Sequence, residues 1–128
     1  MTTPERAPQE LKKINWDYLF HNYDFDDQDE LELLEDLARS LQAELVNLLT
    51  QLEDCSQGGL WNEAGAIVHR MKSSFGNIGM SRASTLCAGI QDALQQGRME
   101  EGAREIERLL QAQNSLLGGL EGLLARIG

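Results

Sequence analysis

His69 is the residue of this sequence whose type and surroundings are best suited to chemistry. It lies in the stretch LWNEAGAIVHRMKSSFGNIGM, residues 60–80. An exposed imidazole is mostly neutral near pH 7 and keeps a lone pair on one ring nitrogen, so it can attack a phosphoryl group without a separate base. A nearby cation offsets the charge that develops on the phosphoryl oxygens, and Lys72 follows three residues later. We therefore predict that His69 is a nucleophile and that Lys72 stabilises phosphoryl charge.

The helical phase of this stretch places His69 opposite an apolar stripe. The stripe residues recur at three- and four-residue steps: Leu60, Ala64, Ile67, Val68, Met71, Phe75 and Ile78. The residues on the side of His69 are mostly small or polar: Asn62, Gly65, Lys72, Ser73, Gly76 and Met80. A glycine costs a helix about 1 kcal/mol relative to alanine. We interpret Gly65 and Gly76 as leaving room for a partner to approach the imidazole.

The charge of the chain is strongly acidic overall and locally basic around His69. The formal net charge is −10, yet no Asp or Glu occurs from Ala64 to Gln91, where Arg70, Lys72 and Arg82 all lie. The net charge argues against nucleic acid and anionic membrane as partners. The local excess of cations favours a surface that receives an anion, although an ordinary solvated face is the alternative interpretation.

Other kinds of catalytic site find little support in the sequence. The chain has two histidines, too few for a multi-histidine zinc site, and no glycine-rich strand-to-helix loop for a nucleotide. Ser73 and Ser74 lack an acidic orienting group at helical spacing, and His21 lies in an aromatic stretch without an accompanying pattern. Cys55 and Cys87 are isolated, so we expect two reduced thiols packed as small hydrophobes in a cytosolic protein.

The elements that must position His69 are all helical. Leucine, alanine, glutamate and glutamine dominate the 128 residues, and the two prolines lie near the N-terminus. No apolar run is long enough to span a membrane, and the first residues do not resemble a secretory signal. We expect a loosely ordered tail over residues 1–9 and one domain over residues 10–128. This domain is predicted to be an antiparallel up-down four-helix bundle with a short additional N-terminal helix.

The helices are predicted from periodicity and from their capping residues. Asp29 is expected to cap the first long helix, with Glu32 reaching back to it, and Gly79 to adopt the left-handed conformation that ends a helix. A break or fraying is expected near Gly118, Gly119 and Gly122. The predicted helices cover residues 9–22, 29–55, 60–78, 82–96 (capped by Ser81) and 99–127.

The spacing of His69, Lys72, Gly76 and Gly79 resembles the signature of histidine-containing phosphotransfer (HPt) domains of bacterial two-component phosphorelays. In that family, a phosphorylatable histidine is followed by a lysine at +3, usually a glycine at +4, a small residue at +7 and a glycine at +10. This sequence departs from the pattern by having Ser73 at +4. It also has Gln91 where an acidic residue often occurs.

The resemblance implies a phosphorelay intermediate. His69 would accept a phosphoryl group from a receiver-domain aspartate or a sensor or hybrid histidine kinase and pass it to a response-regulator aspartate. It implies no ATP-binding or kinase domain in this chain and no cofactor, with Mg²⁺ only on the receiver domain. We expect a cytoplasmic monomer. The partner-binding face would comprise Gly65, Arg70, Ser73, Gly76, Asn77 and Met80, with Trp16, Leu19 or Phe20 joining it.

Two other functions stay open at this point. The bundle could be an adaptor that binds or inhibits a kinase or response regulator without carrying phosphate. It could also be a plain scaffold or dimerisation bundle, for which the leucine-rich last helix is the only sign. The presence of His69 together with Lys72 favours the carrier over the adaptor, because a surface used only for binding does not need a nucleophile.

Overall fold

The computed structural model describes residues 6–128 and consists of helices with short connections. No strand occurs in this part of the chain, so the prediction of an all-helical fold is confirmed. Residues 6–128 form seven helices: α1 (Arg6–Leu11), α2 (Trp16–Asn22), α3 (Gln28–Gln57), α4 (Trp61–Asn77), α5 (Ser81–Gln95), α6 (Met99–Gln111) and α7 (Gln113–Ile127). The tail expected over residues 1–9 lies in part outside the described residues.

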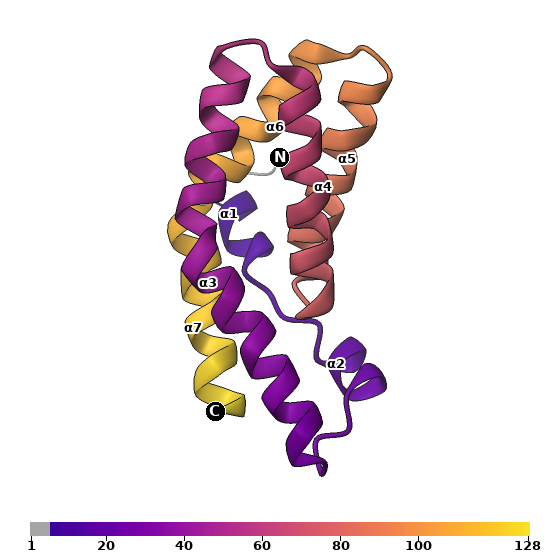
Figure 1. Ribbon diagram of the computed structural model, residues 1–128, viewed down its shortest axis with the longest axis vertical. Helices are drawn as coiled ribbons and strands as arrows, with labels where there is room; N and C mark the ends of the chain where they lie inside the picture. The colour runs from indigo at the N-terminus through magenta and orange to yellow at the C-terminus, as the bar shows by residue number, and fades with distance from the viewer. Residues whose placement is uncertain (1–5) are drawn as a thin grey trace.

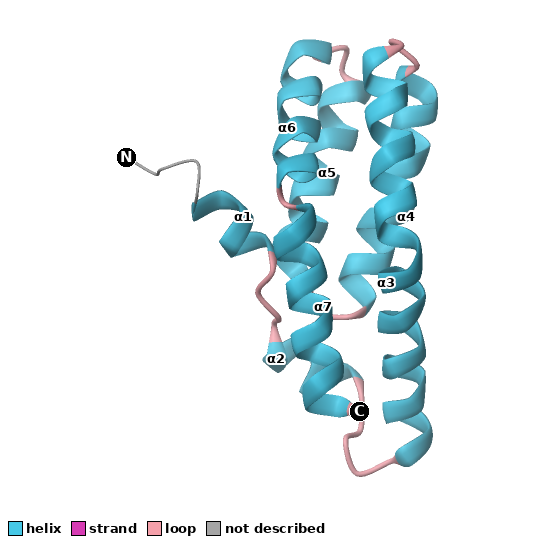
Figure 2. Cartoon of the chain, turned by 90° about the vertical axis from the view of Figure 1, so that its left-hand side faces the viewer, coloured by secondary structure: helices cyan, strands magenta, loops and turns pink. Residues whose placement is uncertain are grey.

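The long helices lie side by side along the longest axis of the molecule (Figures 1 and 2). Helix α4 packs between α3 and α5, and α5 packs in turn against α6. Helix α3 contacts both α6 and α7. The short helix α1 lies against α5, α6 and α7, so the N-terminal segment covers a different side of the molecule from the α3–α4 contact (Figure 2).

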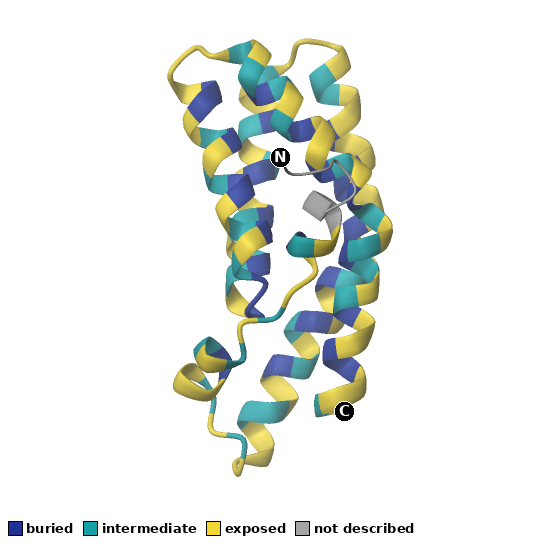
Figure 3. Cartoon of the chain, turned by 180° about the vertical axis from the view of Figure 1, so that it is seen from behind, coloured by how far each residue is buried: buried dark blue, intermediate teal, exposed yellow. Residues whose placement is uncertain are grey.

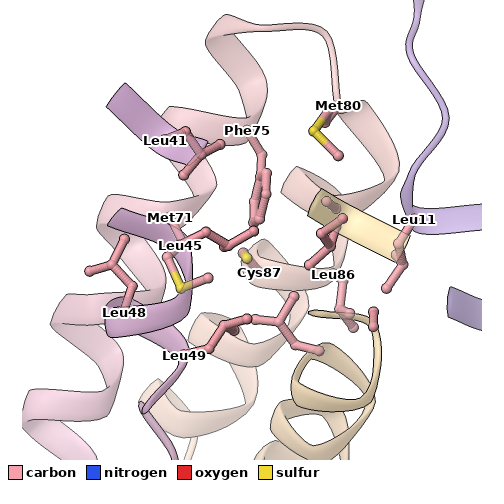
Figure 4. Close-up of a cluster of buried hydrophobic side chains, with 14 of the residues drawn as sticks. Leu11, Leu41, Leu45, Leu48, Leu49, Met71, Phe75, Met80, Leu86 and Cys87 are labelled. Carbon is pink, nitrogen blue, oxygen red and sulfur yellow. The ribbon is translucent and has the colours of Figure 1, made fainter. Parts of the chain in front are cut away.

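The inward faces of these helices form one apolar core. The buried residues of α4 are Ala64, Val68, Met71 and Phe75, which confirms most of the predicted stripe. Met71 and Phe75 point toward leucines of α3 and toward Cys87 of α5 (Figure 4). Leu60 is 51% exposed because it precedes the first turn of α4, so its assignment to the stripe is wrong. Buried and exposed positions alternate with the helical period along each element (Figure 3).

The N-terminal segment forms two short helices instead of the single helix predicted over residues 9–22. Asn15 interrupts it with extended backbone, and its side chain accepts a hydrogen bond from the amide of Tyr18 to cap α2. The Asn15 amide also donates to the carbonyl of Gly79, at 2.7 Å. This contact with the α4–α5 turn fixes the position of α2, and a sequence pattern cannot indicate it.

The start of α3 lies slightly before the predicted position. Asp27, not Asp29, is the N-cap: its carboxylate accepts the amide of Asp29 at 2.9 Å. The expected pair of Asp29 and Glu32 is therefore wrong, because Asp27 already satisfies an amide of the first turn. The helix then continues to Gln57, two residues beyond the predicted end.

The last predicted helix is divided at Ala112 and not at its glycines. Ala112 is fully buried and separates α6 from α7, and both segments contact α3. Helix α7 runs through Gly118, Gly119 and Gly122 to Ile127. Its buried leucines, Leu116, Leu120, Leu123 and Leu124, pack into the core, and this burial offsets the low helix propensity of the glycines.

Candidate functional site

His69 lies in the middle of α4 with its side chain exposed. Val68 and Met71 are fully buried, so the helix holds the imidazole outside the core while its neighbours anchor the backbone. The predicted phase of His69, away from the apolar stripe, is therefore confirmed. An imidazole in this position is accessible to a reacting group from another molecule.

Gln91 of α5 is the partner of the imidazole. Nδ1 of His69 lies 3.1 Å from the amide nitrogen of Gln91 and 3.4 Å from its amide oxygen. When the amide oxygen accepts from Nδ1–H, the lone pair of the neutral ring is on Nε2. Within residues 6–128, Nε2 has no hydrogen-bond partner. Because Gln91 contacts Nδ1 in either arrangement, Nε2 is the ring nitrogen without a partner in residues 6–128, and it is available for attack in the tautomer whose Nδ1–H donates to the amide oxygen.

Lys72 follows His69 by three residues and is half-buried. No ion pair engages its ammonium group within the described part of the chain. Its backbone is held by α5, because the hydroxyl of Ser84 donates to the carbonyl of Lys72 at 2.9 Å. An unpaired ammonium one turn from the imidazole is suited to bind phosphoryl oxygens.

Arg70, the other cation beside His69, is paired across helices. Its guanidinium lies 3.0 Å from a carboxylate oxygen of Glu44 on α3. Both side chains are largely exposed, and such a pair contributes about 0–1 kcal/mol. A docking partner can therefore replace Glu44 at little cost.

The predicted face around His69 is only partly available to a partner. Ser73 and Asn77 are exposed, and Gly65 and Gly76 are half-buried. A Cβ added at Gly65 would meet nothing within 4 Å, so packing within this chain does not explain this glycine. A Cβ at Gly76 would lie 3.4 Å from the Ser84 hydroxyl, so close packing of α4 on α5 explains in part why a glycine occupies this position.

Met80 does not belong to this face, and its prediction as a partner-binding residue is wrong. Its side chain is fully buried and points into the core (Figure 4). The prediction extended the phase of α4 to residue 80, but α4 ends at Asn77 and the chain turns at Gly79, whose φ is +79°. The left-handed conformation predicted for Gly79 is confirmed.

Of the apolar residues expected to join from the N-terminal segment, Leu19 is fully buried and therefore unavailable. It packs against Gly79, where an added Cβ would lie 3.0 Å from its Cγ. Phe20 is 61% exposed and packs between Trp16 and Phe25, with tilted rings whose centroids lie 6.1 and 4.8 Å away. The hydroxyl of Tyr23 donates to the carbonyl of Asn77 at 2.7 Å and ties α2 to the end of α4.

A groove of about 460 Å³ adjoins His69 on the side toward the start of α4. Its apolar surface includes Trp61, Leu94 and Met99, and its polar residues include Asn62 and Gln95. Apart from Asn62, which follows from the helical phase of His69, these residues cannot be predicted from the sequence, because they come from three helices whose contact no local pattern indicates. In the sequence, Gln91 is only a departure from the family pattern, and its contact with His69 depends on how α5 packs against α4.

Neither a metal centre nor a membrane span is found among the described residues. No group of three or more His, Cys, Asp and Glu side chains in residues 6–128 is placed to hold a metal ion. Within the same range, no helix is sufficiently long and apolar to cross a bilayer.

Comparison with known proteins identifies the family. The family model of the Hpt domain matches residues 31–126, which include His69, Lys72 and Gln91. No curated protein and no solved structure matches the chain. The match covers more than half of the 128 residues and includes α4 and α5, the two helices that form the site. The chain therefore belongs to the Hpt domain family, whose members serve phosphotransfer in phosphorelays.

Proposed function

We propose that this protein is a phosphorelay intermediate that carries a phosphoryl group on Nε2 of His69. It would receive the group from a receiver-domain aspartyl phosphate or a sensor kinase and pass it to the aspartate of a response regulator. The observation that carries the proposal is the exposed imidazole whose Nδ1 contacts Gln91 while Nε2 has no partner among the described residues.

The chemical step needs few groups from this chain. The Nε2 lone pair attacks phosphorus, the P–N bond forms, and the P–O bond to the donor aspartate breaks with its electron pair leaving on the carboxylate. Nδ1 keeps its proton throughout, and an amide oxygen of Gln91 stabilises the positive charge that the ring gains. Lys72 offsets charge on the phosphoryl oxygens. Any Mg²⁺ belongs to the receiver domain in this proposal.

The fold suits such a carrier because the site is on rigid elements. We propose that residues 10–128 act as one domain, an antiparallel up-down four-helix bundle in which α6 and α7 together form the fourth helix. The docking face would include Gly65, Arg70, Ser73, Gly76 and Asn77, with Phe20 at its edge. The leucine stripes pack within the chain, which supports a monomer. The proposal also includes a cytoplasmic location.

The test is label transfer from a phosphorylated receiver domain. We expect acid-labile, base-stable label on the wild-type protein and none on His69→Gln. Lys72→Ala should slow the transfer while its circular dichroism and melting temperature stay close to the wild type. Receiver binding without label on either protein would support an adaptor, and label on His69→Gln would assign the chemistry to another residue.

A further inference from the structure

A second groove lies between the connection from α1 to α2 and the outer face of α7. Its volume is about 570 Å³, and its lining includes Lys12, Lys13 and Trp16 on one side and Gly118, Gly122 and Arg126 on the other. Helix α7 lies across the molecule from α4, which carries His69 (Figures 1 and 2). The groove shares no lining residue with the groove beside His69.

The lining of this groove is basic in an acidic protein. It contains three cations and no carboxylate, although the chain has a net charge of −10. Lys13 contacts Glu10 at 3.2 Å, whereas Lys12 forms no ion pair within the described part of the chain. The guanidinium carbon of Arg126 lies 4.9 Å from the ring centroid of Trp16. Stacking uses the face of a guanidinium and leaves its N–H edge able to bind a carboxylate.

Two glycines keep the groove open without being needed by the fold. A Cβ added at Gly118 or at Gly122 would meet nothing within 4 Å. Each of them lowers the stability of α7 by about 1 kcal/mol relative to alanine. Gly119 differs, because a Cβ there would lie 2.7 Å from the carbonyl oxygen of Lys12. Contacts within the chain therefore explain Gly119, and they leave Gly118 and Gly122 unexplained.

We propose that this groove binds a short acidic segment of a partner protein. Carboxylates of the segment would pair with Lys12, Lys13 and Arg126, while an apolar side chain would contact Trp16 and the open surface of α7. Charges more than about 8–10 Å apart are largely screened at physiological ionic strength, so a short segment is attracted by the local cations. A nucleic acid or an anionic membrane extends over the surrounding acidic surface and is repelled there. Because α7 lies across from α4, such a partner can stay bound while His69 is accessible.

The test uses the full chain and a short helical peptide of glutamate, alanine and leucine. We expect the peptide to shift the backbone amide signals of Gly118 and Gly122 and the indole signal of Trp16 in ¹⁵N NMR spectra. The indole signal of Trp61, in the groove beside His69, should stay unchanged. A peptide with lysine in place of glutamate should cause no shifts. Removing two exposed ion pairs by Lys12→Ala with Arg126→Ala should weaken binding by about twofold to thirtyfold.

A substitution that fills the groove distinguishes a loss of peptide binding from a loss of folding. Gly122→Leu places a side chain where the structure has open space, so the peptide should no longer bind while the melting temperature is retained or raised. Gly89→Leu is the matched control, because Gly89 is also an exposed helical glycine with no atom within 4 Å of an added Cβ. It should leave peptide binding unchanged. The proposal is wrong if the acidic peptide does not shift the groove signals, or if it binds Gly122→Leu as well as wild type. It is equally wrong if duplex DNA or anionic phospholipid vesicles shift these signals and the peptide does not.

Discussion

Replacing Gln91 by leucine tests how the structure prepares His69 for attack. The change removes both the donor and the acceptor beside Nδ1 and keeps a side chain of similar size. A hydrogen bond such as the one from Nδ1–H of His69 to the amide oxygen of Gln91, 3.4 Å away, contributes about 0.5–1.5 kcal/mol. If this contact is needed to orient the ring, its loss slows phosphoryl transfer by about twofold to thirteenfold. The melting temperature should change little, because Gln91 is only half-buried.

The assay is rapid-quench measurement of label moving from an excess of phosphorylated receiver domain. Gln91→Glu should retain transfer, because a carboxylate accepts from Nδ1–H and stabilises the protonated ring. Gln95→Leu is the control: Gln95 lines the same groove but makes no hydrogen bond with His69. Transfer by Gln91→Leu at the wild-type rate, or an equal slowing in Gln95→Leu, would contradict a role of Gln91 in orienting His69.

Further predictions concern the residues that hold the site in place. Tyr23→Phe removes the hydrogen bond to the carbonyl of Asn77 and should lower the melting temperature by about 2–5 °C in calorimetry. Burial raises the pKa of Tyr23 in the folded protein. The contribution of Tyr23 to stability is therefore complete below the unfolded pKa of about 10 and is lost as the pH rises through the folded pKa. In alkaline unfolding, the wild type should lose more stability than Tyr23→Phe. Met80→Ala should lower the free energy of unfolding by about 2–5 kcal/mol in urea titrations, because the side chain is fully buried. A decrease below about 1 kcal/mol would contradict the position of Met80 in the core. Burial raises the pKa of Cys87 to about 12, so its thiol should not react in the native protein at pH 8. A thiol reagent should then modify only the half-buried Cys55, and it should modify both cysteines after denaturation.

The features that the sequence predicts well depend on local periodicity. The apolar stripe of α4 and the exposure of His69 follow from the helical repeat, which burial in the core enforces. The conformation of Gly79 is predictable because few other residues adopt a positive φ at a helix end. The spacing of Lys72 from His69 alone predicts its role, and within the described residues its ammonium group forms no ion pair.

The features that the sequence does not predict depend on contacts between helices. Gln91 reaches His69 only because α5 packs against α4 in one register. The divided N-terminal segment depends on the hydrogen bond from Asn15 to the turn at Gly79. The burial of Met80 does not follow from the helical phase of α4, because that phase does not extend beyond Asn77, where the helix ends.

The most direct measurement of the central claim is an NMR spectrum of the protein labelled with ¹⁵N in its histidines and phosphorylated by a receiver domain. We predict one phosphohistidine, with phosphorus coupled to Nε2 of His69, and no such signal in His69→Gln. Phosphorus bonded to Nδ1, to His21 or to a hydroxyl or carboxylate oxygen would contradict the account.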